Sequence, residues 1–232
     1  MSPRIQGTKW LSRAGEPLKL GQMSNDPDLE SAYALETPED NRRLYRAWAE
    51  SYDNEFVDAT DFRVPSLIAQ AYPEAGGQWP CLDVGCGTGA VAEHMPSDAV
   101  LDGIDLSPEM LAVAARKSKY RHLFEANLKE TLPFDDASYA GLISSGTFTH
   151  GHVGAEALNE LVRIMRPGGL AIFSIKPEIW DEMGFGAAFS RLTNAGTIGN
   201  LITSEEQVYG DPAKAPDGHA DDMGRIVRFR RI

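Results

Sequence analysis

The stretch Cys81-Leu82-Asp83-Val84-Gly85-Cys86-Gly87-Thr88-Gly89-Ala90 decides the fold of this chain. Leu82 and Val84 form the apolar end of a buried strand, and three glycines follow within five residues. Glycine accepts positive φ angles and lets a ligand approach the backbone closely. Residues 90–95 then have the character of a first helical turn, whose free N–H groups would face the ligand. This order predicts a nucleotide-type site built on Gly85, Gly87 and Gly89.

Two kinds of ligand fit such a site, and two aspartates bear on the choice. The stretch also matches the G-x-G-x-x-A form of the dinucleotide fingerprint. Asp105 follows the next apparent strand, residues 100–104, and lies 105 − 85 = 20 residues after Gly85, so it can bind ribose hydroxyls in either interpretation. Asp83 stands two residues before the first glycine, where we expect its side chain to face the ligand. A carboxylate there would repel a pyrophosphate and suits an ammonium group, such as the amino acid end of S-adenosylmethionine (SAM).

Two segments resemble the class I SAM-dependent methyltransferases. Residues 82–89, LDVGCGTG, resemble the first motif of that family, and residues 103–111, GIDLSPEML, resemble the second. The resemblance implies that Asp105 binds the ribose, and that Leu106 and Met110 form apolar walls for the adenine.

The residues after the third expected strand, 120–126, extend the adenine site. The family usually has an aspartate where Asn127 stands, accepting a hydrogen bond from the adenine amino group. Asparagine supplies a carbonyl acceptor without the charge. We therefore include Asn127 and Leu128 among the cofactor-binding candidates.

A helix is expected to begin at Thr37-Pro38-Glu39-Asp40, which combines a capping hydroxyl, a proline at the first position and acidic residues. Residues 45–53, YRAWAESYD, resemble the segment that precedes the first motif in many small-molecule methyltransferases, although Arg46 stands where an aspartate is usual. The resemblance implies that Tyr45 and Tyr52 close over the methionine part of SAM. We expect Trp48 to pack in the core instead.

The methyl acceptor is expected beyond the fourth strand, residues 140–145, because ligands of open α/β sheets lie at the carboxyl ends of strands. Ser144 at this end is a further cofactor-binding candidate. His150 is the candidate general base, since imidazole has an unperturbed pKa of about 6.5. The alternative is that His150 bonds to backbone or shapes the pocket. His152 directly precedes an apparent helix, and it could merely cap that helix.

The remaining pattern predicts a doubly wound α/β fold with a mostly parallel, seven-stranded sheet and an antiparallel C-terminal strand. Residues 1–36 form an N-terminal extension, and residues 37–232 form the methyltransferase domain. Whether the extension is a loose tail, an upstream addition before Met23 or a substrate lid stays open. Further elements are expected as helices over 64–72, 155–165 and 178–192, a fifth strand over 170–175, and a closing hairpin over 198–209 and 225–230.

Composition limits the function. The 232 residues suit one α/β domain, and the net charge of −12 disfavours nucleic acid as a partner. Two cysteines, Cys81 and Cys86, cannot form a disulfide framework, which suggests a reducing cytoplasm. No apolar run approaches membrane-spanning length, so membrane insertion is not expected.

These observations together predict transfer of a methyl group from SAM to a small-molecule acceptor by in-line displacement, with no metal site assigned. Residues 148–154, FTHGHVG, and the N-terminal segment most resemble the Williams–Beuren-region methyltransferase-like branch, which implies no particular acceptor. Two alternatives stay open. A nicotinamide-dependent oxidoreductase would need a Tyr/Lys pair after the fourth strand, and a non-catalytic module would bind SAM without turnover. The oligomeric state is left open.

Overall fold

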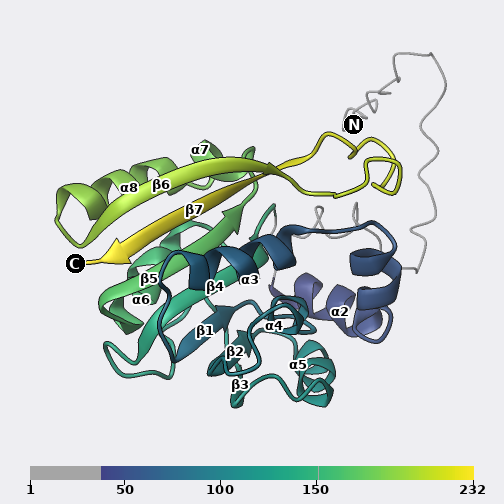
Figure 1. Ribbon diagram of the computed structural model, residues 1–232, viewed down its shortest axis with the longest axis horizontal. Coiled ribbons are helices and arrows are strands. Elements are labelled where there is room, and N and C mark those ends of the chain that lie inside the picture. The colour runs from purple at the N-terminus through teal and green to yellow at the C-terminus, as the bar shows by residue number, and fades with distance from the viewer. Residues whose placement is uncertain (1–37, 151) are drawn as a thin grey trace, which may run out of the picture.

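The computed structural model describes residues 38–150 and 152–232, which form one twisted sheet with helices on both of its faces (Figure 1). The predicted helix cap Thr37 and the predicted extension over residues 1–36 lie outside the described residues. The seven strands are β1 (Cys81–Val84), β2 (Leu101–Asp105), β3 (His122–Glu125), β4 (Tyr139–Phe148), β5 (Met165–Ile175), β6 (Ile198–Gln207) and β7 (Met223–Arg231).

The strand order is β3-β2-β1-β4-β5-β7-β6. The strands β1 to β5 pair in parallel, whereas β7 runs antiparallel to both β5 and β6. This confirms the predicted doubly wound sheet and its antiparallel C-terminal strand. The reversal of strand order falls between β1 and β4, which places the carboxyl end of β1 and its glycine turn at the crevice where such sheets bind ligands.

Helices cover both faces of the sheet (Figure 1). One apolar cluster joins the sheet to α3 and α4, and a second joins it to α6, α7 and α8. The helices are α2 (Pro38–Trp48), α3 (Val64–Glu74), α4 (Ala90–Glu93), α5 (Pro108–Arg116), α6 (Leu158–Ile164), α7 (Ile179–Glu182) and α8 (Phe185–Asn194), with a π-helical segment η1 (Asp53–Asp58) and a 3-10 turn η2 (Ala155–Ala157). None of the helices in the described ranges is long and apolar enough to cross a bilayer.

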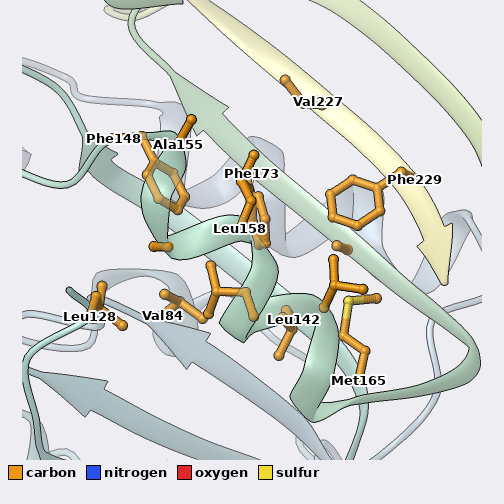
Figure 2. Close-up of a cluster of buried hydrophobic side chains, with 14 of the residues drawn as sticks. Val84, Leu128, Leu142, Phe148, Ala155, Leu158, Met165, Phe173, Val227 and Phe229 are labelled. Atoms are coloured by element: carbon orange, nitrogen blue, oxygen red, sulfur yellow. The ribbon is translucent and has the colours of Figure 1, made fainter. Parts of the chain in front are cut away.

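The larger core cluster holds the central strands in place (Figure 2). Leu158 on α6 packs among side chains of neighbouring strands, including Leu142 and Phe173, and all three are fully buried. Burial of one such side chain stabilises the fold by roughly 1.5–3 kcal/mol. The central strands are therefore a rigid base for the loops at their carboxyl ends.

The fourth strand is longer than predicted and continues through residues that the sequence suggested were loop. β4 reaches Phe148, but its register with β5 shifts between Ser144 and Phe148. Gly146 has a φ of +75° within this irregular part, and its N–H donates to the Ser174 hydroxyl at 2.9 Å. The shift places residues 145–147 at the ligand edge of the sheet.

Other predicted boundaries were also wrong. The helix expected over 178–192 is divided into α7 and α8 at Gly184, which has a φ of +74° that a helix interior does not admit. The helix expected over 155–165 begins with the 3-10 turn η2, and the fifth strand starts at Met165 instead of Leu170. The predicted N-terminal helix ends at Trp48, so Tyr52 lies beyond it.

Candidate functional site

The glycine turn after β1 is fastened to the end of β2. Gly85, Gly87 and Gly89 have φ angles of +67°, +53° and +89°, as the sequence predicted. The N–H of Gly87 donates to Oδ2 of Asp105 at 2.8 Å, and the N–H of Ser107 donates to Oδ1 of the same carboxylate at 2.8 Å. Asp105 therefore fixes the turn as well as facing the ligand edge.

Burial raises the pKa of Asp105 above its usual range, although the N–H donors of Ser107 and Gly87 oppose this effect by stabilising the charged form. A ligand hydroxyl that donates to this carboxylate would lower its pKa, as those N–H donors do. Ribose hydroxyls have that capacity.

A cavity opens over the turn, with an empty volume of about 1010 Å³ that includes the part open to solvent. We call it the first cavity. Nine of the predicted cofactor-binding residues line it: Tyr45, Tyr52, Gly85, Gly87, Asp105, Leu106, Met110, Asn127 and Leu128. They come from α2 and its continuation, the β1–α4 turn, the β2–α5 junction and the segment after β3, so the fold brings together residues that are distant in sequence.

The lining of the first cavity fits SAM. A Cβ atom added to Gly87 would meet nothing within 4 Å, so open space lies directly over this glycine. Asp105 supplies an acceptor for ribose hydroxyls, while Leu106 and Met110 supply apolar surface for a purine ring. The side-chain oxygen Oδ1 of Asn127 accepts from the backbone N–H of Lys129 at 3.0 Å, so the predicted adenine contact stays a prediction.

Asp83 does not line the first cavity, contrary to the expectation that it faces the ligand. Its side chain is 1% exposed and accepts a 2.7 Å hydrogen bond from the Tyr120 hydroxyl. Its other oxygen, Oδ1, is buried and has no hydrogen-bond partner among the described residues. Burial, opposed by the Tyr120 hydrogen bond, raises the pKa of Asp83 to about 7. The contact with the SAM ammonium group stays a prediction.

Gly89 and Ser144 also lie outside the first cavity. Gly89 precedes α4 and faces the Tyr120 ring, where an added Cβ would lie 3.1 Å from a ring carbon. Ser144 is fully buried, and its hydroxyl donates to the carbonyl of Val84 at 2.7 Å. Both residues therefore shape the turn and the strand that support the site, and neither forms its surface.

The N-terminal segment forms a cap over the first cavity. Ala49 packs against Met110 and Val113, which places α2 on α5. The Thr88 hydroxyl of the glycine turn donates to Asp53 at 2.5 Å, so the cap is tied to the turn. Tyr45 and Tyr52 both line the first cavity, and their predicted contact with the methionine part of SAM stays a prediction. Trp48 is 4% exposed, as expected for a packing residue.

His152, rather than the predicted His150, reaches the cavity wall. Nδ1 of His152 lies 2.8 Å from the carbonyl oxygen of His150, and a carbonyl can only accept, so Nδ1 carries the proton. Nε2 then accepts from the Tyr45 hydroxyl at 3.1 Å. Burial lowers the pKa of His152, an effect that the carbonyl of His150 partly opposes, which keeps the ring neutral near pH 7.

The side chain of His150 turns elsewhere. Its Nε2 lies 4.0 Å from Oε2 of Glu182, and the residue lines neither of the cavities described in this section. Its predicted role as general base gains no support from this position.

Other wall residues were not predicted from the sequence. Ser145, Gly146 and Thr147 line the first cavity because of the irregular end of β4, and Oγ of Ser145 is buried without a hydrogen-bond partner among the described residues. The sequence signal that could have identified them was their position at the carboxyl end of an apolar strand. Phe62 also lines the cavity, and no local pattern marks it.

A second cavity, with an empty volume of about 700 Å³, adjoins the first. The walls of both contain Tyr45, Tyr52, Phe62, Gly146 and His152. The second cavity continues past the carboxyl ends of β4 and β5, where Phe148, Ser174 and Lys176 line it, to the connection between β6 and β7. The Tyr45–His152 pair therefore stands between two adjacent spaces.

Comparisons with known proteins agree with this geometry. Residues 82–173 match the family described as "Methyltransferase domain". Human Methyltransferase-like protein 27 is 31% identical over 169 residues, which are 68% of this chain and 68% of that protein. The ubiquinone/menaquinone biosynthesis C-methyltransferase of Brucella abortus is 27% identical over 228 residues, covering 86% of this chain and 80% of the relative.

A solved structure shares the fold. The N-methyltransferase NodS from Bradyrhizobium japonicum, determined in complex with S-adenosyl-L-homocysteine, superposes with a TM-score of 0.61 at 14% identity. The superposition covers 82% of this chain and 97% of that one.

Proposed function

Because this chain belongs to the class I SAM-dependent methyltransferases, we propose that it methylates a small-molecule acceptor that enters the second cavity. The observation that carries the proposal is the common wall of the two cavities, which lets a cofactor and an acceptor meet beside Tyr45 and His152. The relative from Brucella abortus, named for ubiquinone and menaquinone biosynthesis, supports an acceptor of small-molecule size.

SAM supplies a methyl group that is activated by its positively charged sulfur. In the proposed complex, Asp105 binds the ribose hydroxyls, and Leu106, Met110 and Leu128 enclose the adenine. Gly85 and Gly87 leave room for the backbone to approach the amino acid part, under the cap that carries Tyr45 and Tyr52. The protein's main contribution is to hold two reactants in line and to exclude water, which are large effects for a transfer of this kind.

We assign the proton-accepting role to His152. Its Nε2 atom is unprotonated and faces the junction through the Tyr45 hydroxyl. An acceptor that must lose a proton can transfer it to this nitrogen directly, or can donate to the Tyr45 oxygen while Tyr45 donates to His152. An acceptor that needs no deprotonation would leave the pair in a purely positioning role.

The test has two parts. SAM and its demethylated product should stabilise the native state by about 2.7 kcal/mol at a hundred times the dissociation constant, measured by thermal unfolding. Labelled SAM incubated with the enzyme and a metabolite extract should then yield a labelled small molecule.

Each alternative has its own outcome. Stabilisation by NADH without stabilisation by SAM would replace methyl transfer with oxidoreduction. Binding of SAM with no labelled product from any extract would indicate a non-catalytic SAM-binding module.

A further inference from the structure

We propose that the second cavity takes a planar aromatic acceptor that carries an anionic oxygen group, a carboxylate or an ionised hydroxyl, bound by Lys176. The inference rests on the proposed function, because it names the class of acceptor for that same reaction. It follows from the ring-lined walls of the cavity, from the charge at its far end and from the way the fold holds that end in place.

Aromatic rings form most of the apolar wall. Trp48 and Phe56 lie 5.6 Å apart between centroids, and Phe56 and Phe62 lie 5.2 Å apart, so the rings form a continuous layer. Phe62 continues this layer to Tyr209 at 6.3 Å. Ring pairs favour offset and edge-to-face contacts at these separations. A flat aromatic ligand in the cavity would extend the same packing.

Lys176 carries the positive charge of this wall. Among the described residues that line the second cavity it is the only lysine or arginine, and it contributes to the second cavity but not to the first. Its side chain is 13% exposed. A ligand group that meets Lys176 therefore lies away from the junction, and the reacting atom of the same ligand can remain beside His152.

Asp222 shares this end of the cavity without cancelling the role of Lys176. Nζ of Lys176 forms a long ion pair with Oδ2 of Asp222 at 4.0 Å, beyond hydrogen-bond distance, whereas Nδ1 of His219 lies 2.9 Å from the same oxygen. A lysine has three N–H donors, so the ammonium can remain near Asp222 and still donate to a ligand oxygen. The same ammonium would repel a cationic amine and so oppose the attraction that the aromatic wall and Asp222 exert on such a group.

Backbone contacts hold the connection between β6 and β7 against the segment that precedes α3. Phe62 and Tyr209 form an isolated antiparallel bridge, the N–H of Arg63 donates to Val208 at 3.0 Å, and the N–H of Gly210 donates to Asp61 at 2.9 Å. The connection between β6 and β7 thus meets residues 61–63, in the segment that leads into α3 (Figure 1). The charged residues therefore occupy defined positions relative to the aromatic wall.

The experiment compares three ligands of one shape in the presence of S-adenosylhomocysteine. Calorimetry would measure the binding of 2-naphthoate, 2-naphthamide and 2-naphthylmethylammonium to the full chain. We expect naphthoate to bind at least tenfold more tightly than naphthamide, and the ammonium ligand to bind most weakly. Lys176→Met should remove the preference for naphthoate, and Lys176→Arg should retain it. Lys214→Met removes the same charge at an exposed position in the connection between β6 and β7. This variant should keep the preference for naphthoate.

Binding of S-adenosylhomocysteine by each variant shows that it is folded and separates the two proposals. If the wild-type protein binds neither SAM nor S-adenosylhomocysteine, the proposed function fails. If it binds S-adenosylhomocysteine but shows equal affinity for naphthoate and naphthamide, prefers the ammonium ligand or binds none of the three, the acceptor class is wrong. A preference for naphthoate that survives in Lys176→Met would also overturn the role of Lys176.

Discussion

The hydroxyl of Tyr45 lies 3.1 Å from Nε2 of His152, and this contact joins α2 to the segment after β4 across 107 positions of sequence. Their rings meet edge to face with centroids 5.7 Å apart. The contact lies in the wall that both cavities share. It fixes the cap over the first cavity and the candidate base relative to each other.

Replacement of His152 by glutamine should lower turnover by about 10²–10⁴-fold while SAM affinity stays nearly unchanged, because the variant loses the unprotonated nitrogen. The matched control is His150→Gln, two residues away and outside both cavities. Turnover would be measured with the acceptor found by the extract screen. A large loss in His150→Gln with full activity in His152→Gln would restore His150 as the base.

The pH dependence of turnover should reflect the same residue. Burial lowers the pKa of His152 below the usual value, so the ring stays neutral down to a pH below 6.5. Activity should therefore be retained at pH 6.5 and decline only at lower pH, as protonation removes the base. The acidic limb of the kcat/KM profile should disappear in His152→Gln, and an unchanged limb would assign it to another group.

Alanine substitutions at Gly85 and Gly87 should have different consequences. A Cβ atom at Gly85 would collide with the Thr147 side chain, so Gly85→Ala should lower the melting temperature clearly. A Cβ atom at Gly87 meets nothing within 4 Å and would enter the ligand space, so Gly87→Ala should destabilise the fold less than Gly85→Ala, through the strain of its positive φ alone, and should weaken SAM binding. Thermal unfolding and SAM titration of both variants test this, and equal effects on both quantities would contradict it.

Two aspartates of β2 offer a matched pair. Asp105→Asn should weaken SAM binding by about 1.5–3 kcal/mol through loss of the charged hydrogen-bond acceptor. Asp102→Asn should lower stability with little effect on SAM affinity, because Asp102 is buried and accepts from Arg121 and Tyr139 outside the first cavity. SAM titration and chemical unfolding of both variants would separate the roles, and equal SAM affinity in Asp105→Asn and the wild type would reject the ribose assignment.

Asp83 should make stability depend on pH in the absence of ligand. Its pKa is about 7 in the folded chain against 3.8 ordinarily, so the native state keeps a proton that the unfolded state releases between these values. The stability contributed by this carboxyl is therefore complete below about pH 4 and is lost as the pH rises through 7. Asp83→Asn should gain stability relative to the wild type between pH 5 and pH 8, measured by chemical unfolding. Parallel pH profiles for the two proteins would contradict this.

The sequence alone was sufficient to predict the strand, glycine turn and helix that begin the site. Gly85, Gly87 and Asp105 could be assigned because local geometry leaves few alternatives to a run of glycines after an apolar strand, and because the next strand must end beside it. The resemblance added Tyr45 and Tyr52, and both face the first cavity.

Tertiary structure decided which side chains around this turn line the first cavity. Asp83 accepts a hydrogen bond from Tyr120, 37 positions away, and does not line the first cavity. His152 replaces His150 at the wall because a shift in the register of β4 and a contact with Tyr45 determine where this segment runs. In the second cavity, the lining residues Phe62 and Tyr209 are joined by a backbone bridge. Such contacts join distant parts of the chain, and local patterns of residues carry no signal of them.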